Sequence, residues 1–160
     1  MSTGSQTTGA EYVVEFTSPF SLRSPVGGPS GLFFDIAYVF FVEGVEQGRS
    51  RSRSRVATRM YEYRLLDHSH RELLVYHWQP GPDFAGPDHP HLHVSAALDA
   101  QVDAVTRREI VLDKLHVATG RVSFAAIVRM LITEFRVAPQ RHDWRETLDR
   151  TEAVLRAETS

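Results

Sequence analysis

The sequence predicts an α+β domain, in which an antiparallel sheet comes first and two helices follow. Roughly the first hundred residues hold alternating or aromatic-rich stretches that are separated by turns rich in proline and glycine. The last forty residues instead carry apolar side chains at helical spacing. Strands followed by helices are typical of the α+β class. We therefore expect a meander sheet of about five strands with two C-terminal helices packed on one face.

Five stretches have the composition of strands, because β-branched and aromatic residues dominate them or alternate with polar ones. They are Glu11–Thr17, Leu32–Val42, Arg55–Leu66, Glu72–Trp78 and His89–Leu98. In the third stretch, one face is expected to carry Ala57, Arg59, Tyr61, Tyr63 and Leu65. The segments 18–31 and 44–54, which are rich in Pro/Gly and in polar residues respectively, are expected to be loops.

Two helices are expected near the C-terminus. Ser123 is a suitable N-cap for a helix that continues through Phe135, with Ile127 and Leu131 in its apolar stripe. A second helix is expected to begin at Asp143-Trp144. The pattern of residues 99–120 is ambiguous and favours a short helix followed by a short strand around 110–117.

The overall composition limits the class of protein. A length of 160 residues fits one domain, which we place at residues 11–158 after a loose tail at 1–10. The absence of cysteine excludes disulfides, thiolate zinc sites and cysteine nucleophiles. A net charge of −2 excludes the global positive field typical of many nucleic-acid binders. No signal peptide is visible, and Asp35 interrupts the longest apolar stretch, so we expect a cytoplasmic protein without a membrane segment.

The densest group of functional side chains is the run Asp88-His89-Pro90-His91-Leu92-His93-Val94. In a strand, alternate residues point to one face, so the three imidazoles would project together. Imidazole is also the side chain whose ordinary pKa lies nearest neutrality, and it is a common metal ligand. The run therefore indicates where chemistry would take place.

Binding of a divalent metal ion is one chemistry that this run allows. In a flat strand His89 and His93 would be about 13 Å apart, whereas zinc needs nitrogens at about 2.1 Å. One ion would therefore take an adjacent pair and a further ligand from elsewhere, such as His77, Glu62 or His116. The candidate ligands are His89, His91, His93 and His77. Alternatively, the histidines coat a solvent-exposed face or form a hydrogen-bonded cluster.

Metal-free cleavage of a phosphodiester is the second chemistry. His91 and His93 would be the acid–base pair, with His89 and His116 in support. Arginine and tyrosine side chains would bind phosphate, and aromatic rings would stack on the bases of single-stranded RNA. The candidate substrate-binding residues are Arg59, Tyr61, Arg64, Trp78 and Arg121. Alternatively, the aromatic residues serve only to pack the sheet.

The segment from about Met60 to Leu148 resembles known bacterial families. The run Tyr61-Glu62-Tyr63-Arg64, the strand that ends at Trp78 and the Asp/His cluster at 88–93 are similar in order to TumE-type toxins of toxin–antitoxin pairs. The later run His116-x-x-Thr119-Gly120-Arg121 and the pair Asp143-Trp144 also resemble a widespread uncharacterised bacterial family. The first resemblance implies ribonuclease activity and a cognate antitoxin.

The sequence thus leads to two functional hypotheses. The first is a small bacterial toxin-like protein with ribonuclease or nucleotide phosphodiesterase activity at the histidine strand, acting on RNA or a nucleotide. The alternative is a non-enzymatic interaction or accessory module, whose histidines are incidental or bind a structural metal. A close antiparallel mate for the exposed edge strand, or a homodimer through Leu32–Val42, would favour the second hypothesis.

Overall fold

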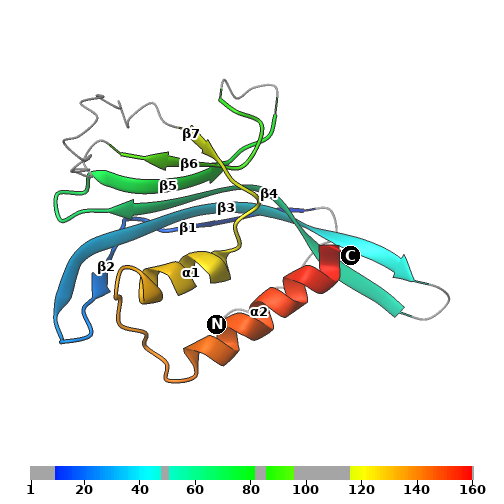
Figure 1. The fold of residues 1–160 in the computed structure, drawn as a ribbon. Coiled ribbons are helices and arrows are strands. Elements are labelled where there is room, and N and C mark those ends of the chain that lie inside the picture. Colours follow the sequence, from blue (N-terminus) through cyan, green and yellow to red (C-terminus); the bar gives the residue numbers. More distant parts are fainter. Residues whose placement is uncertain (1–9, 48–50, 82–85, 96–115, 160) are drawn as a thin grey trace.

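The computed structural model describes residues 10–47, 51–81, 86–95 and 116–159. These residues form a twisted antiparallel sheet with two helices on one side of it (Figure 1). The strands are β1 (Glu11–Glu15), β2 (Phe20–Arg23), β3 (Pro29–Gln47), β4 (Arg51–Leu66), β5 (Glu72–Trp78), β6 (His91–Val94) and β7 (His116–Ala118). The helices are α1 (Phe124–Thr133) and α2 (Trp144–Thr159). The predicted α+β class and the helices on one face are confirmed.

The sheet is a meander whose order is β1-β3-β4-β5-β6-β7, with β2 paired to the beginning of β3. The described part of the chain therefore has seven strands, and the prediction of about five was too low. The predicted loop at 18–31 contains β2, because Leu22 is buried in the core and Phe20 packs edge-on against Phe34. The short helix expected after residue 99 and most of the short strand expected around 110–117 lie outside the described residues, and only the end of that strand overlaps with β7.

Two predicted strand boundaries were wrong. The segment 44–54 is not a loop over its described residues, since β3 runs on to Gln47 and β4 begins at Arg51. Their polar residues can stay in strands because the two backbones satisfy each other's hydrogen bonds. Strand β6 begins at His91 and not at His89, because Pro90 has no N–H to donate to a neighbouring strand.

The core lies between the sheet and α1. Tyr61, Tyr63 and Leu65 of β4 point to this side, where they meet Ile127 and Leu131 of α1. Ser123 caps α1 as predicted, since its Oγ accepts a hydrogen bond from the backbone N–H of Ala126. We call this side of the sheet the helix face.

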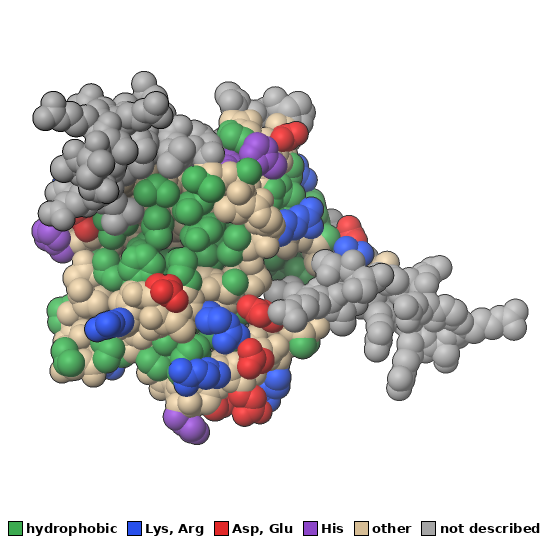
Figure 2. Space-filling view, viewed as in Figure 1, with side chains coloured by type: hydrophobic (Ala, Val, Ile, Leu, Met, Phe, Trp, Pro, Cys, Tyr) green, Lys and Arg blue, Asp and Glu red, His purple; other side chains and the backbone are tan. Residues whose placement is uncertain are grey.

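Helix α2 lies beside α1 and contacts it, on the same side of the sheet (Figure 1). Figure 2, in the same orientation, shows hydrophobic side chains gathered on the surface above the helices. Val117 of β7 and Phe124 of α1 are two exposed apolar residues of the described chain. Neither described helix is both long and apolar enough to cross a membrane.

Candidate metal centre

The opposite side of the sheet carries a group of histidines, and we call it the histidine face. Strand alternation separates it from the core: Tyr76 pairs with Leu92 on the helix face, whereas His77 pairs with His91 on the other. The next pair on the histidine face is Val75 with His93. Two neighbouring strands thus bring His77, His91 and His93 together.

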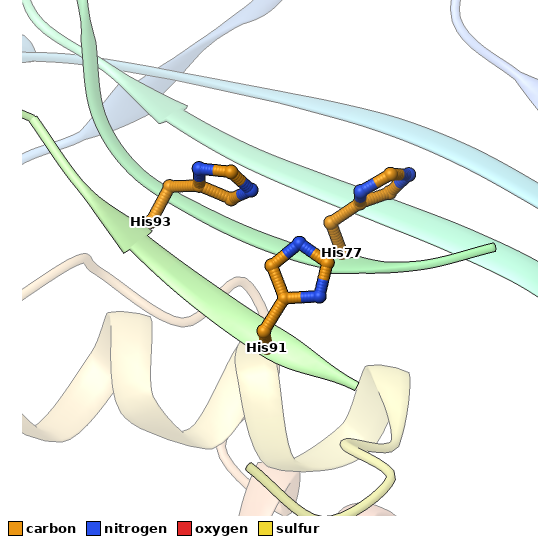
Figure 3. A group of neighbouring side chains, drawn as sticks. All are labelled: His77, His91 and His93. Carbon is orange, nitrogen blue, oxygen red and sulfur yellow. The ribbon is translucent and has the colours of Figure 1, made fainter. Parts of the chain in front are cut away.

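The three imidazoles are close enough to share one metal ion. One ligand nitrogen from each ring lies within 4.8 Å of the others (Figure 3). The ring centroids are 5.3 Å apart for His77 and His91, and 4.7 Å apart for His91 and His93. In a tetrahedral zinc site, nitrogens at about 2.1 Å from the ion lie about 3.4 Å from each other. Small rotations of the side chains would therefore bring the three nitrogens into coordinating positions.

The backbone before β6 fixes the orientation of the His91 ring. Its Nδ1 lies 2.8 Å from the backbone carbonyl oxygen of His89, which can only accept a hydrogen bond. In the neutral ring, this hydrogen bond places the proton on Nδ1 and leaves the lone pair on the buried Nε2. Metal-binding histidines commonly donate their other ring N–H to a carbonyl in this way. At 1% exposure, His91 is also the most buried of the three.

His77 is kept neutral by its surroundings. Burial of the ring is the main cause that lowers its pKa, and the neighbouring His91 lowers it further. The carboxylate of Glu62 and a hydrogen bond with the side chain of Gln79 act in the opposite direction. The net effect lowers the pKa and favours the neutral imidazole, the form that binds metal.

Among the described residues, Arg64 of the histidine face lies within ion-pair distance of three carboxylates. The guanidinium of Arg64 pairs with the buried carboxylate of Asp35, and its Nε and Nη1 lie 3.4 Å from Glu62 and 4.0 Å from Glu72. Glu62 also pairs with His77 across β4 and β5. Within this described network, three carboxylates and one guanidinium leave a net negative charge. Such a charge favours a bound cation.

A small cavity lies next to His93. Its volume is about 120 Å³, and its lining residues are Glu72, Leu73, Val75, His93, Val94 and Ser95. A space of this size admits a few water molecules or a small group, since one water occupies about 30 Å³ in the liquid. Solvent can therefore come close to the third histidine.

The structure separates the predicted histidines into two sets. His77, His91 and His93 form the group, whereas His89 lies in the segment before β6. The side chain of His89 is 52% exposed and its Nδ1 lies 3.5 Å from Asp88. His116 of β7 pairs with His93 through the backbone. The side chain of His116 is not among those that the structure describes.

Three of the predicted substrate-binding residues lie on the helix face. Tyr61 and Trp78 are buried in the core, and Tyr61 accepts a hydrogen bond from the N–H of Val122. Arg121 stacks on Trp78, with its guanidinium carbon 4.2 Å from the ring centroid. The sheet separates these side chains from the histidines. The two sets therefore cannot contact the same phosphate group.

The other two predicted substrate-binding residues lie on the histidine face. Arg64 forms an ion pair with Asp35. The guanidinium of Arg59 lies over the ring of Phe41 and 3.6 Å from the carboxylate of Glu11. The sequence prediction did not include Asp35 or Glu72. One signal was available for Asp35, since it is the single charge within an apolar stretch.

No family model, curated protein or solved structure matches this chain. Arguments about its function therefore depend on the geometry of the described residues.

Proposed function

We propose that the protein is a metal-dependent phosphodiesterase that acts on RNA or nucleotides through a centre formed by His77, His91 and His93. The observation that carries the proposal is the convergence of three imidazole nitrogens within 4.8 Å. Three imidazoles without a thiolate suit zinc and other divalent transition metals. Three protein ligands also leave one coordination position open, as in catalytic zinc sites.

The chemistry of such a centre is hydrolysis. The metal would lower the pKa of a bound water and supply hydroxide at neutral pH. Such a hydroxide could add to phosphorus and break a P–O ester bond, and the departing oxygen would take up a proton equivalent to the one that the water lost. The products are a phosphate monoester and an alcohol. His77, His91 and His93 would hold the centre, and the cavity beside His93 would admit the water.

Two further arguments support this function. The hydrogen bond from His91 to the carbonyl of His89 fixes the tautomer that coordination requires. The resemblance to TumE-type toxins makes RNA the first substrate to test, and a cognate antitoxin the partner to seek.

A structural metal in a non-enzymatic module is the second candidate. The burial of His77 and His91, at 7% and 1% exposure, favours it, since structural sites are closed to solvent. Cobalt substitution separates the two candidates. An open site changes its visible absorption when azide is added, whereas a closed site does not.

The test combines metal analysis with cleavage assays on the purified full chain. We expect about one equivalent of a divalent transition metal in the wild type, and cleavage of RNA that chelation abolishes and metal restores. His91→Ala and His93→Ala should lose both. His89→Ala is the matched control, because its exposed ring lies outside the group, and it should retain both.

Three outcomes would count against the proposal. Metal-free protein that cleaves RNA would replace it with imidazole acid–base chemistry. A stoichiometric metal without cleavage of RNA or nucleotides would favour the structural site. Neither metal nor cleavage would leave the histidines as a packed cluster.

A further inference from the structure

The two longest strands continue beyond the sheet as a two-stranded ribbon. Strand β1 pairs with β3 only as far as Phe41, and β5 pairs with β4 only from Tyr61 onward. Beyond these points, residues 42–47 of β3 and 51–56 of β4 pair only with each other among the described residues. Figure 1 shows this end of the hairpin projecting away from the other strands. We call residues 42–47 and 51–56 the ribbon.

One face of the ribbon is rich in arginine. Residues 51, 53 and 55 of β4 take alternate positions, which places Arg51, Arg53 and Arg55 on one face. Their partners across the ribbon are Gln47, Val45 and Glu43. This face therefore carries three positive residues against one carboxylate. The residues between them, Ser52 and Ser54, belong to the other face.

The arginine face is continuous with the histidine face of the sheet. Along β3, alternate residues lead from Gln47, Val45 and Glu43 to Asp35, which pairs with Arg64. Along the same face, Ala37 pairs with Glu62, and Glu62 pairs with His77. Because cross-strand partners share a face, the arginines and the histidines lie on the same side. Arg55 and Glu62 are seven residues apart, or roughly 23 Å along the strand.

Regularly spaced positive charges on an extended strand suit a linear polyanion. Alternate residues of a strand repeat at about 6.6 Å, which is similar to the separation of successive phosphates in an extended single strand. Arginine binds phosphate with paired N–H donors. The described residues of the ribbon include no aromatic residue for base stacking, so contacts with the phosphate backbone would dominate and sequence preference would be low.

We propose that the arginine face of the ribbon binds the phosphate backbone of single-stranded RNA and leads it toward His77, His91 and His93. Binding by the ribbon does not depend on metal, whereas delivery of a scissile bond to the histidines rests on the proposed function. The first part can therefore be tested separately.

The experiment measures binding of a fluorescent 20-nucleotide oligouridine by anisotropy, with the full chain and a chelator to prevent metal-dependent cleavage. The variant Arg51→Gln/Arg53→Gln/Arg55→Gln should bind at least tenfold more weakly than the wild type at low salt. Loss of three phosphate contacts should also reduce the slope of log K against log salt by about 2, given about 0.7 per contact on a single strand.

The matched control is Arg23→Gln/Arg145→Gln/Arg150→Gln, which removes the same charge from exposed positions outside the ribbon. It should bind within about threefold of the wild type. Equal loss in both triple variants would overturn the proposal, because net charge alone would then explain binding. The variant Arg51→Lys/Arg53→Lys/Arg55→Lys should retain most of the affinity, which separates loss of charge from misfolding. A result in which the lysine variant is as weak as the glutamine variant would also overturn it.

A second measurement distinguishes this proposal from the metal centre. The glutamine variant of the ribbon should keep its metal content and its rate on a dinucleotide, which is too short to span about 23 Å, while its rate on the 20-nucleotide RNA falls. Vesicles that contain phosphatidylserine provide the last comparison. Binding to these vesicles without binding to RNA would identify anionic lipid, and not RNA, as the ligand of the ribbon. That result would contradict the proposal.

Discussion

The two faces of the sheet use the same strands for different purposes. On the helix face, Tyr61, Tyr63 and Leu65 of β4 pack against α1 and are almost fully buried. On the histidine face, Glu62 and Arg64 of the same strand belong to a charged network beside His77. Neighbouring residues of one strand therefore serve stability on one face and the charged site on the other, so substitutions one position apart should have different consequences.

The largest loss of stability is expected from a cavity on the helix face. Tyr63 is 1% exposed, and Tyr63→Ala removes a large ring from the centre of the core. We expect a loss of about 3–5 kcal/mol in the free energy of unfolding, as for other aromatic-to-alanine substitutions in cores. Urea denaturation followed by circular dichroism measures it. A loss below about 1 kcal/mol would show that this face does not hold the fold together.

A smaller effect is expected from the histidine face. Arg64→Met removes the partner of Asp35, whose side chain is only 8% exposed. Because the Arg64 side chain is 39% exposed and water screens the pair, we expect a loss of about 1–3 kcal/mol. Arg129→Met is the control, because it breaks an ion pair with Asp149 that is more exposed. Equal losses in the two variants would mean that burial of Asp35 adds nothing.

Tyr63→Phe tests the contribution of a single buried oxygen on the helix face. The Tyr63 hydroxyl oxygen is buried, and no partner for it is found among the described residues. Burial also raises the pKa of this phenol, so it stays protonated. Removing the oxygen while keeping the ring should leave stability unchanged or raise it by about 1 kcal/mol. A clear loss in urea denaturation would reveal a partner for the hydroxyl.

Another expected effect is a pH dependence of stability at the turn between β4 and β5. The Asp67 carboxylate accepts hydrogen bonds from the backbone N–H groups of Ser69 and Arg71, and from the Arg71 side chain. These bonds lower its pKa from 3.8 to about 2. A lowered pKa means that the carboxylate stabilises the fold above pH 3.8 and that this contribution is lost as pH falls through about 2.

Asp67→Asn should therefore be less stable than the wild type at neutral pH, and the difference should disappear between about pH 4 and pH 2. Thermal melting at a series of pH values tests this, with His68→Asn as a control at an exposed position of the same turn. If the difference in stability between Asp67→Asn and the wild type stayed constant down to pH 2, the loss would come from the shape of the side chain and not from its charge.

The alternation of β4 shows how far sequence could predict the fold. Tyr61, Tyr63 and Leu65 were expected on one face and Glu62 and Arg64 on the other, and the structure confirms this. The prediction was wrong for Ala57, which pairs with Phe41, and for Arg59, which lies over the Phe41 ring on the histidine face. A β-bulge opposite Val39 and Phe40 adds a residue to β4 and shifts the alternation. No residue in this stretch signals a bulge, so the pattern alone could not reveal it.

The candidate site could be predicted only in part for a similar reason. The alternation of His91 and His93 was visible, because both lie within one strand. His77 could be named as a candidate, but its place opposite His91 depends on the register between β5 and β6. That register is fixed by tertiary pairing across the Pro/Gly-rich segment between them. Sequence could not distinguish His77 from His116 or Glu62 as the third ligand.

The length of β3 has a consequence for amide hydrogen exchange. Residues 33–34 and 37–41 of β3 pair with β4 on one side and with β2 or β1 on the other, whereas residues 42–47 pair with β4 alone among the described strands. Amides of the first part should exchange only when the whole domain unfolds, and those of the second by local opening. The first part of β3 therefore serves as an internal reference for unfolding of the whole domain, and residues 42–47 report local opening of the ribbon. A ligand that docks on the ribbon should slow exchange at residues 42–47 and leave the rates at 33–41 unchanged.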